Sequence, residues 1–423
     1  MVWFGGLIVI LTFAAIVKKY ETRMVLFAAG LVMCIAGGDL GAAVTVFSKT
    51  MVHGTLVPTI CTVMGFSFVM KLTECDKHLV TALSSLLNKG KMILIPLALL
   101  LTWWINIAIP SAAGCAAAVG SILIPTMINA GVHPAMAGSV VLAGTWGSAI
   151  SPGTSHNPFV AKLAGVDIMD VILNEAPAAI IASLVVVVAL TAISIIKKEG
   201  PDEARRQAIA KASESGSGSQ DAFHVNPLKA LVPLVPLILL VLGSKQIGIL
   251  PVVSVPMAML SGVILGLVVT MTDPQEVTKK FFDGMGSAYG SVMGLIVAAA
   301  VFTEGMKLVG LTNELIEIMK NSDSIAKVAG AFGPFIIAIL CGSGDAAALA
   351  FNGAITPHAA NFGMTIMDLG SLAQMAGAIG RSMSPVAGAA IICAQLANVS
   401  PMELTKRNAV PMLLGVITFM VLF

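Results

Sequence analysis

Charged residues are scarce in this chain. Asp, Glu, Lys and Arg together make up 11% of its 423 residues, whereas a soluble domain averages about 25%. Hydrophobic residues make up 57% of the chain, and the mean hydropathy is +0.95. This composition excludes an ordinary soluble globular protein, and no charge run suggests nucleic-acid binding. The net charge of +2 is uninformative for so hydrophobic a chain.

Cysteines are also few, and none of them belongs to a cluster of metal ligands. The six cysteines are scattered, mostly within apolar runs, and no CxxC or Cys/His group occurs in the sequence. Such spacings predict neither a disulfide framework nor a metal site. Each cysteine is therefore expected to be a small buried hydrophobe, and no cofactor is expected.

Long apolar runs, in contrast, are abundant. Many of them approach the length of about 20 residues that a helix needs to cross a bilayer, which predicts an all-α, multi-pass membrane protein. Residues 1–17 lack a basic leader and a small-residue cleavage site, so we expect a retained helix rather than a signal peptide. The single long polar stretch, residues 197–229, has the composition of a flexible linker.

Two stretches of the sequence share one unusual pattern. Residues 143–152 read AGTWGSAISP and residues 376–385 read AGAIGRSMSP. Upstream of them, Ser111 and Ser343 are separated in the sequence by almost the same number of residues as the two stretches are. Close helix packing would explain the small residues but not the paired Ser-Pro breaks. The chain is therefore interpreted as two repeated halves, residues 1–196 and 230–423, joined by the linker at 197–229.

Each half is expected to hold a re-entrant hairpin and a broken helix. The hairpins cover residues 92–130 and 326–361, with tips at 110–114 and 341–346; two full spans joined by a tight turn would also fit the first. The helix breaks are expected at 151–158 and 381–388, because proline cannot continue a helix. Broken backbone inside a bilayer requires protein or a water-filled cavity around it.

The remaining runs bring the expected number of spans to about ten. Continuous spans are expected at 2–17, 24–38, 55–72, 173–196, 230–243, 252–271, 286–308 and 409–423, with amphipathic stretches at 76–88 and 312–320. Lys and Arg in the short loops place the linker in the cytoplasm and both termini outside. The first hairpin then enters from the cytoplasm and the second from the opposite face, so the two repeats are inverted.

Inverted repeats with discontinuous helices are typical of secondary transporters that bind substrate near the bilayer midplane. A helix that begins inside the membrane presents free N–H groups, which attract anions. Two tips and two breaks can meet at one cavity. The candidate substrate-binding residues are Ser111, Ala112, Gly114, Ser151, Thr154, Ser155, His156, Asn157, Ser343, Gly344, Asp345, Arg381, Ser382 and Ser384.

Several candidates allow more than one role. Arg381 could bind a substrate carboxylate, or could pair with Asp345 or with backbone carbonyls. Asp345 could take up a proton or lie beside a cation, or could cap the following helix. His156 could donate to a second carboxylate or be structural, and Ser111 and Ser343 could be neutral ligands or only pack at the tips.

The second-half motifs resemble a known family. GRSMSPVAG at 380–388 and SPMELTKRNAVP at 400–411 resemble the anaerobic four-carbon dicarboxylate transporters of the Dcu C type, within the ion transporter superfamily. PSAAG at 110–114, the Ser-Pro-Gly-Thr-Ser break and CGSGDA at 341–346 extend the resemblance over both halves.

The resemblance implies a carrier for succinate, fumarate or malate in a bacterial inner membrane. It also implies exchange, uptake or efflux by elevator motion, and a homodimer. The Ser-Asn-Thr hairpin pattern of the wider superfamily is missing, which argues against a sodium site of that type. Coupling to sodium or to protons stays open.

Other classes of function fit less well. A carrier for another small organic anion or an amino-acid-like substrate is the nearest alternative. An intramembrane hydrolase would need an aligned nucleophile and base, and Ser155 and His156 are adjacent in sequence. A channel would need a continuous polar helix face, which the sequence lacks. We therefore expect a transporter and not an enzyme.

Overall fold

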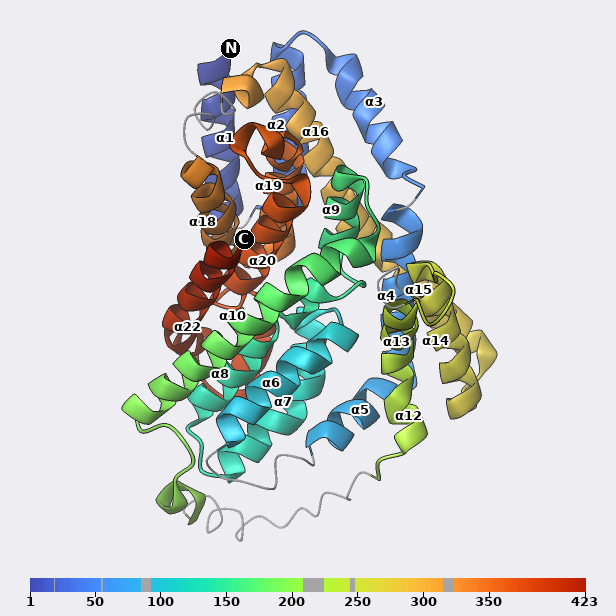
Figure 1. The fold of residues 1–423 in the computed structure, drawn as a ribbon, viewed down its shortest axis with the longest axis vertical. Helices are drawn as coiled ribbons and strands as arrows, with labels where there is room; N and C mark the ends of the chain where they lie inside the picture. The colour runs from blue at the N-terminus through green and yellow to red at the C-terminus, as the bar shows by residue number, and fades with distance from the viewer. Residues whose placement is uncertain (19, 55, 85–92, 208–223, 244–247, 315–322) are drawn as a thin grey trace.

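The computed structural model describes residues 1–18, 20–54, 56–84, 93–207, 224–243, 248–314 and 323–423 (Figure 1). Within these ranges the regular structure is entirely helical, as the sequence predicts. The central part of the expected linker and parts of both amphipathic stretches (85–88 and 315–320) lie outside the described residues.

The first half opens with four helices, two of which form a bent pair. They are α1 (Val2–Val17), α2 (Thr22–Ala36), α3 (Leu40–Met51) and α4 (Leu56–Leu72), followed by the short α5 (Cys75–Ser84). The sequence analysis assigns no element to α3, whose residues are less uniformly apolar than those of α1. Asp39 caps α3 by accepting the N–H of Ala42 at 2.9 Å, and α3 meets α4 at 49°.

The first hairpin and the first broken helix follow. The hairpin consists of α6 (Leu94–Ala108) and α7 (Ala112–Asn129), and the broken helix of α8 (Pro134–Gly144), the 3-10 turn η2 (Gly147–Ile150) and α9 (His156–Ala164). The α-helix ends at Gly144, whereas the sequence predicts that it continues to residue 150. At Gly147 the chain runs so close to α6 that a Cβ atom would clash with the Trp103 carbonyl oxygen. The long α10 (Ile168–Ile196) closes this half.

The second half repeats this order. It begins with α12 (Pro227–Leu231), η3 (Val232–Leu234), α13 (Val235–Leu242) and α14 (Val255–Thr270), and continues through α15 (Pro274–Ala288), the π-helical η4 (Tyr289–Met293) and α16 (Gly294–Leu308). The hairpin is α18 (Asp323–Cys341) with α19 (Gly344–Ala354) and η5 (Thr356–Phe362). The broken helix is α20 (Ile366–Arg381) with α21 (Gly388–Ala397), and α22 (Pro401–Leu422) ends the chain.

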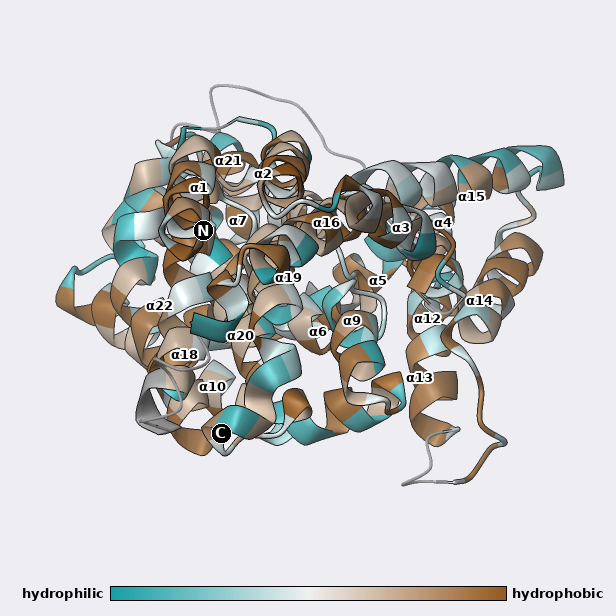
Figure 2. Ribbon diagram, turned by 90° about the horizontal axis from the view of Figure 1, so that it is seen from above, coloured by the Kyte–Doolittle hydropathy of each residue, from teal (hydrophilic) through white to brown (hydrophobic). Residues whose placement is uncertain are grey.

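The two largest errors in the predicted helix starts are spans that were predicted to begin too late. Residues 274–308 form one continuous helical run, whereas the prediction starts at 286, and α22 begins at Pro401 rather than at 409. Both helices start with polar residues that resemble a loop in a hydropathy pattern. Figure 2 shows that the outer part of α15 is hydrophilic, whereas α13 and α14 are largely hydrophobic. A polar first turn therefore hides the true helix start.

The two hairpins enter the molecule from opposite ends. In Figure 1, α6 and α7 rise from the lower end, and α18 and α19 descend from the upper end. Among the described residues, four helices are long and apolar enough to span a membrane, namely α7, α10, the 274–308 run and α22; the bent pair α3–α4 would make a fifth. The other expected continuous spans, at 2–17, 24–38, 230–243 and 252–271, correspond to apolar helices shorter than 18 residues.

The hairpins and broken helices share one hydrophobic core. A large cluster of buried side chains joins α6, α7, α8, α10, α18, α20, α21 and α22. Two other clusters join α1, α2, α4 and α16, and α4, α13, α14 and α15, with α9 and α19 also contacting the first of these two. The first group, together with α9 and α19, is called the hairpin unit below, and the helices α1–α4 and α12–α16 are called the outer unit.

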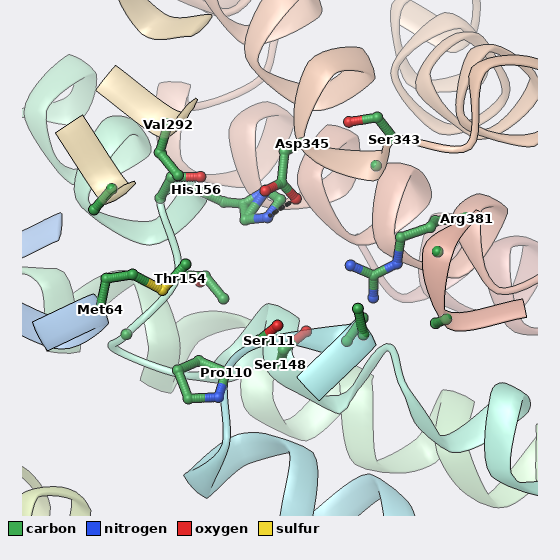
Figure 3. Close-up of a pocket in the computed structure, with 18 of the residues that line it drawn as sticks. Met64, Pro110, Ser111, Ser148, Thr154, His156, Val292, Ser343, Asp345 and Arg381 are labelled. Atoms are coloured by element: carbon green, nitrogen blue, oxygen red, sulfur yellow. Dashed lines mark ion pairs between the residues drawn. The ribbon is translucent and has the colours of Figure 1, made fainter. Parts of the chain in front are cut away.

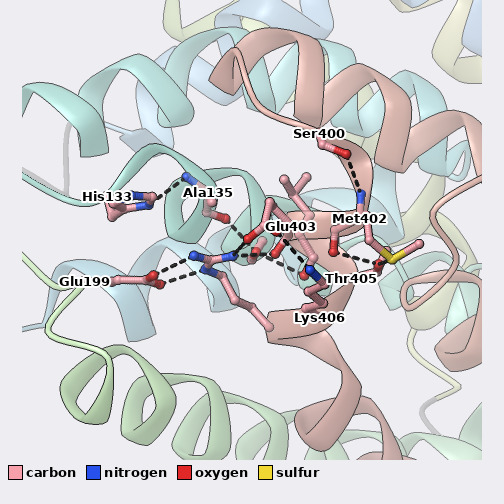
Figure 4. A network of polar contacts seen from close by, with 11 residues as sticks. His133, Ala135, Glu199, Ser400, Met402, Glu403, Thr405 and Lys406 are labelled. Atoms are coloured by element: carbon pink, nitrogen blue, oxygen red, sulfur yellow. Dashed lines mark hydrogen bonds and ion pairs between the residues drawn. The ribbon is translucent and has the colours of Figure 1, made fainter.

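An ion pair ties together the ends of α10 and α22 in the hairpin unit (Figure 4). Arg407 donates to Glu199 through Nε at 2.7 Å and through Nη2 at 2.5 Å. Burial works to raise the pKa of Glu199, but the hydrogen bonds and charge of Arg407 outweigh it and hold this pKa below its usual value. The start of the 197–229 stretch is therefore packed against the hairpin unit.

Candidate functional site

Both hairpin tips are built around the same helix cap. Ser111 Oγ accepts the N–H of Gly114 at 3.1 Å at the start of α7, and Ser343 Oγ accepts the N–H of Ala346 at 3.2 Å at the start of α19. Each serine satisfies one of the donors that a helix N-terminus leaves free. The interpretation of Asp345 as the cap is therefore wrong, because Ser343 occupies that position.

The two tips and the two breaks line a single cavity of about 240 Å³ (Figure 3). Four helix N-termini reach it, through Ala112 of α7, His156 of α9, Gly344 of α19 and Gly388 of α21. The starts of α9 and α21 have no side-chain cap. Because a helix N-terminus carries partial positive charge, four of them at one cavity make it attractive to anions.

Nine of the fourteen residues predicted to bind substrate line this cavity. They are Ser111, Ala112, Thr154, Ser155, His156, Ser343, Gly344, Asp345 and Arg381. The other five, Gly114, Ser151, Asn157, Ser382 and Ser384, do not line it. Most of these five lie at the breaks, where their polar groups bond to nearby backbone or side chains.

Asn157 illustrates why a polar residue at a break can miss the cavity. Its Nδ2 donates to the carbonyl oxygens of Ala149 and Ser151, at 2.8 and 2.9 Å. The side chain is fully buried and satisfies carbonyls that the interrupted helix leaves without partners. Asn157 thus holds the break in shape.

Part of the cavity wall comes from the outer unit, which the sequence analysis did not consider. Ile60 and Met64 of α4, Ala288 of α15 and Val292 of η4 line it opposite the tips. These residues are apolar and isolated in the sequence, so no motif points to them. Of the outer-unit elements that line the cavity, η4 is a π-helical turn, and such turns are frequent at functional sites.

Arg381 is the only Lys or Arg among the described residues that line the cavity. Its Nη2 donates to the carbonyl oxygen of Thr145 at 2.7 Å, and its buried Nε has no partner. Of the structural partners considered from sequence, a backbone carbonyl is therefore the one found, and no Arg381–Asp345 ion pair is present in the described part of the chain. The guanidinium still has donors available for a ligand.

Asp345 instead contacts His156. His156 Nε2 lies 2.9 Å from Asp345 Oδ1, and the histidine side chain is almost fully buried whereas the aspartate is 38% exposed. Figure 3 shows the two side chains in contact at the cavity, where one comes from α9 and the other from α19. The pair joins the break of the first half to the tip of the second.

Comparison with known proteins identifies the family. The model of the C4-dicarboxylate anaerobic carrier family, DcuC, matches residues 3–423. The chain belongs to the DcuC family. This confirms the resemblance seen in the sequence, and it makes the chain a multi-pass protein of the bacterial inner membrane, as DcuC transporters are.

Relatives of this DcuC-family chain agree with that assignment. A Haemophilus influenzae protein known only as an uncharacterized transporter is 42% identical over 279 residues, which is 65% of this chain and 99% of its own. The anaerobic C4-dicarboxylate transporter DcuC of Escherichia coli K12 is 25% identical over 451 residues, 98% of this chain and 95% of its own. A probable DcuC of Vibrio cholerae is also 25% identical, over 463 residues, 98% of this chain and 96% of its own.

A solved structure shares the fold of this DcuC-family chain. The crystal structure of the YdaH transporter of Alcanivorax borkumensis superposes with a TM-score of 0.55, covering 90% of this chain and 86% of that one. Because the sequences are only 16% identical, this likeness concerns the fold alone.

Proposed function

We propose that this DcuC-family chain is a secondary transporter of C4-dicarboxylates such as succinate, fumarate or malate, and that the cavity between the hairpin tips binds the substrate. The observation that supports the proposal best is the meeting of four helix N-termini and one arginine in a small cavity. Such an arrangement suits a compact anion. The volume of about 240 Å³ lies below the range of drug-sized pockets, roughly 300–1,000 Å³.

Two kinds of donor bind the two ends of the substrate in this proposal. One carboxylate accepts from the guanidinium of Arg381 in a charge-assisted pair. The other accepts from free backbone N–H groups at the starts of α9 and α21, which carry no side-chain cap. The serines that cap α7 and α19 position these tips and do not supply the main binding energy.

The proposed movement is a displacement of the hairpin unit against the outer unit. The hairpin unit has its own core and holds most of the cavity, while α4, α15 and η4 supply the opposing wall. Sliding of one packed unit along the other would carry the cavity from one membrane face to the other. The homodimer is part of this proposal, because a moving unit needs a stable scaffold.

Counterflow in proteoliposomes tests the function directly. Vesicles that contain the purified protein and unlabelled succinate should accumulate labelled fumarate with saturable kinetics, and protein-free vesicles should not. Ohmic conductance of the dicarboxylate would instead show a channel, and chemical conversion of it would show an enzyme. Either result without saturable counterflow would overturn the proposal.

One observation favours a second substrate class. Asp345 places a half-exposed carboxylate in the same cavity as Arg381. This pair of opposite charges would suit an amino acid, whose ammonium group could bind Asp345 and whose carboxylate could bind Arg381. Inhibition of fumarate counterflow by aspartate more strongly than by succinate would select this alternative.

A further inference from the structure

A glutamate lies fully buried in α10, outside the cavity described above. Glu175 has no exposed surface, and α10 is the most apolar of the four candidate spans. The sequence analysis gave it no role. An ionisable residue in a membrane helix is costly and is by default a candidate for function.

The hydrogen bonds around Glu175 fix which of its oxygen atoms accepts. Carbonyl oxygens of the first break orient the Asn157 amide, as described above, so that Asn157 Oδ1 faces Gln374. Gln374 Nε2 donates to this oxygen at 2.6 Å and to Glu175 Oε2 at 2.6 Å. Because Oε2 accepts, a proton on the carboxyl group has its place on Oε1.

Among the described residues, three buried oxygen atoms in this region make no hydrogen bond of good geometry. They are Glu175 Oε1, Gln374 Oε1 and Ser371 Oγ, of which the Ser371 hydroxyl lies close enough to interact with the Glu175 carboxyl. Ser371 and Gln374 stand one turn apart on α20, which packs against α10, and all three side chains are fully buried. Unpartnered buried polar atoms are rare and call for an explanation. A group that gains and loses a proton during a transport cycle supplies one.

Among the residues that the structure describes, no cation forms an ion pair with Glu175. The elements that contact α10 most extensively are α6, α8, α9, α20 and α22, with η2, and α6, α8 and η2 contain no titratable residue. The titratable residues of the other three are His156, Lys162, Asp368, Arg381, Glu403, Lys406 and Arg407. None of them forms an ion pair with Glu175 in the described part of the chain.

Three of these titratable groups have other partners. His156 contacts Asp345, Arg381 donates to Thr145, and Asp368 accepts from Asn174 Nδ2 at 3.0 Å. A buried carboxylate without a cation would be strongly destabilising, and such a group holds a proton instead. In its buried position Glu175 is therefore a neutral carboxylic acid.

We propose that Glu175 carries the coupling proton of transport. It takes up a proton from one side of the membrane, holds it while buried between α10 and α20, and releases it to water when the hairpin unit opens to the other side. The proposal rests on the transport function above and adds the coupling ion. Gln374 Nε2 occupies Glu175 Oε2, so Oε1 is the oxygen that holds the proton. The unpartnered oxygens nearby could also serve a sodium ion, and the sodium-gradient experiment below separates the two ions.

The same hydrogen bonds connect the protonation of Glu175 to the substrate site. Loss of the proton leaves a carboxylate that needs more donors than Gln374 alone provides. Gln374 is shared with Asn157, and Asn157 holds the break next to His156 in the cavity wall. Deprotonation of Glu175 therefore disturbs the hydrogen bonds that shape the substrate site.

Proteoliposomes under a pH gradient test this assignment. Full-length wild-type protein should take up succinate at least tenfold faster when the outside is acidic, and a pH-sensitive dye inside should report acidification that depends on succinate. Glu175→Gln keeps the size and the accepting oxygen but cannot release a proton. It should retain succinate counterflow and lose both the gradient-driven uptake and the acidification.

Two further variants keep the test decisive. Asp368→Asn removes the carboxyl group of the same helix pair that bonds to Asn174, and it should keep full proton coupling. If Glu175→Gln is too unstable to reconstitute, Glu175→Asp retains a titratable group and should couple protons at a reduced rate. Thermal unfolding of each variant in detergent checks its stability.

The outcomes separate this inference from the function on which it rests. Gradient-driven uptake by Glu175→Gln at the wild-type rate would overturn the inference. So would wild-type uptake driven by a sodium gradient at constant pH, or normal wild-type counterflow with no response to pH gradients; in these cases dicarboxylate transport would still stand. Absence of any wild-type dicarboxylate counterflow would overturn the proposed function itself.

Discussion

The two halves of the chain build the cavity with the same backbone but with different charges. Ser111 and Ser343 cap their tips in the same way, and each half has a helix break next to its tip. Two residues after the capping serine, the first half has Ala113 and the second half has Asp345. Where the first half has Ser148, the second half has Arg381. The repeat thus provides the anion-attracting N–H groups twice, whereas the charged side chains at these positions occur once.

This asymmetry separates two contributions to selectivity. Backbone donors from both halves favour any small anion, and they cannot distinguish one carboxylate from another. Arg381 and Asp345 add directional charge from one side only, and His156 of the first half reaches across to Asp345. Changes at the charged positions should therefore alter substrate selection, and changes at the repeated positions should alter stability.

The largest effect is expected from removing the cavity's arginine. Arg381→Gln should weaken succinate binding by roughly 30- to 150-fold, since a charge-assisted pair contributes about 2–3 kcal/mol. Arg381→Lys keeps the charge but loses the planar fork, so its effect should be intermediate. Isothermal titration with succinate measures both. Ser148→Ala, at the equivalent position of the first half, is the matched control and should change affinity less than threefold.

A stability measurement on the same proteins distinguishes binding from structure. Arg381 also donates to the Thr145 carbonyl, so a purely structural arginine would lower the melting temperature and leave affinity unchanged. Because Asp345 contacts His156 rather than Arg381, Asp345→Asn should not rescue Arg381→Gln. Rescue of stability in that double mutant would contradict the geometry described here.

The sequence predicts the elements that interrupt the helices better than the contacts that shape the site. Proline, glycine and serine act locally, so the tips at Ser111 and Ser343 and the break after Arg381 could be found without a structure. The helix starts that are polar, as at Pro274, could not be found in this way, because a polar first turn resembles a loop.

Long-range contacts were beyond the sequence analysis for a different reason. Gln374 bonds to residues 217 and 199 positions away, and nothing in the local sequence of either partner marks the pair. The His156–Asp345 contact likewise depends on how two distant elements pack. Four of the five candidate residues that do not line the cavity lie at a break, where a polar side chain can satisfy the broken backbone instead of facing the cavity.

A smaller effect is expected from removing the carboxylate of the second tip or from adding one to the first tip. Asp345→Asn removes a half-exposed negative charge that faces a bound dianion, so succinate affinity should rise by up to about fivefold, within the roughly 1 kcal/mol range of exposed charge pairs. Ala113→Asp adds a carboxylate to the first tip and should weaken binding by a similar factor. If both variants weaken binding, Asp345 acts by holding His156 and not through its charge.

The smallest effect on binding is expected at the repeated caps. Ser111→Ala and Ser343→Ala should each destabilise the protein by about 0.5–2 kcal/mol, as loss of an N-cap generally does. The two losses should be nearly equal because the cap geometry repeats. Thermal unfolding in detergent measures them, with Ser121→Ala on the exposed face of α7 as control. A loss confined to one serine would break the equivalence of the tips.

The most direct test of the account is protection of the cavity by its substrate. A cysteine at Ala113 faces the cavity, and one at Ser121 lies exposed near the middle of the same helix; both are placed in a Cys341→Ala background. Alkylation of the cysteine at 113 should slow at least tenfold in saturating succinate and remain unchanged in acetate, while the cysteine at 121 reacts equally in all conditions. Unchanged alkylation at 113, in a preparation that exchanges succinate, would show that the dicarboxylate binds elsewhere.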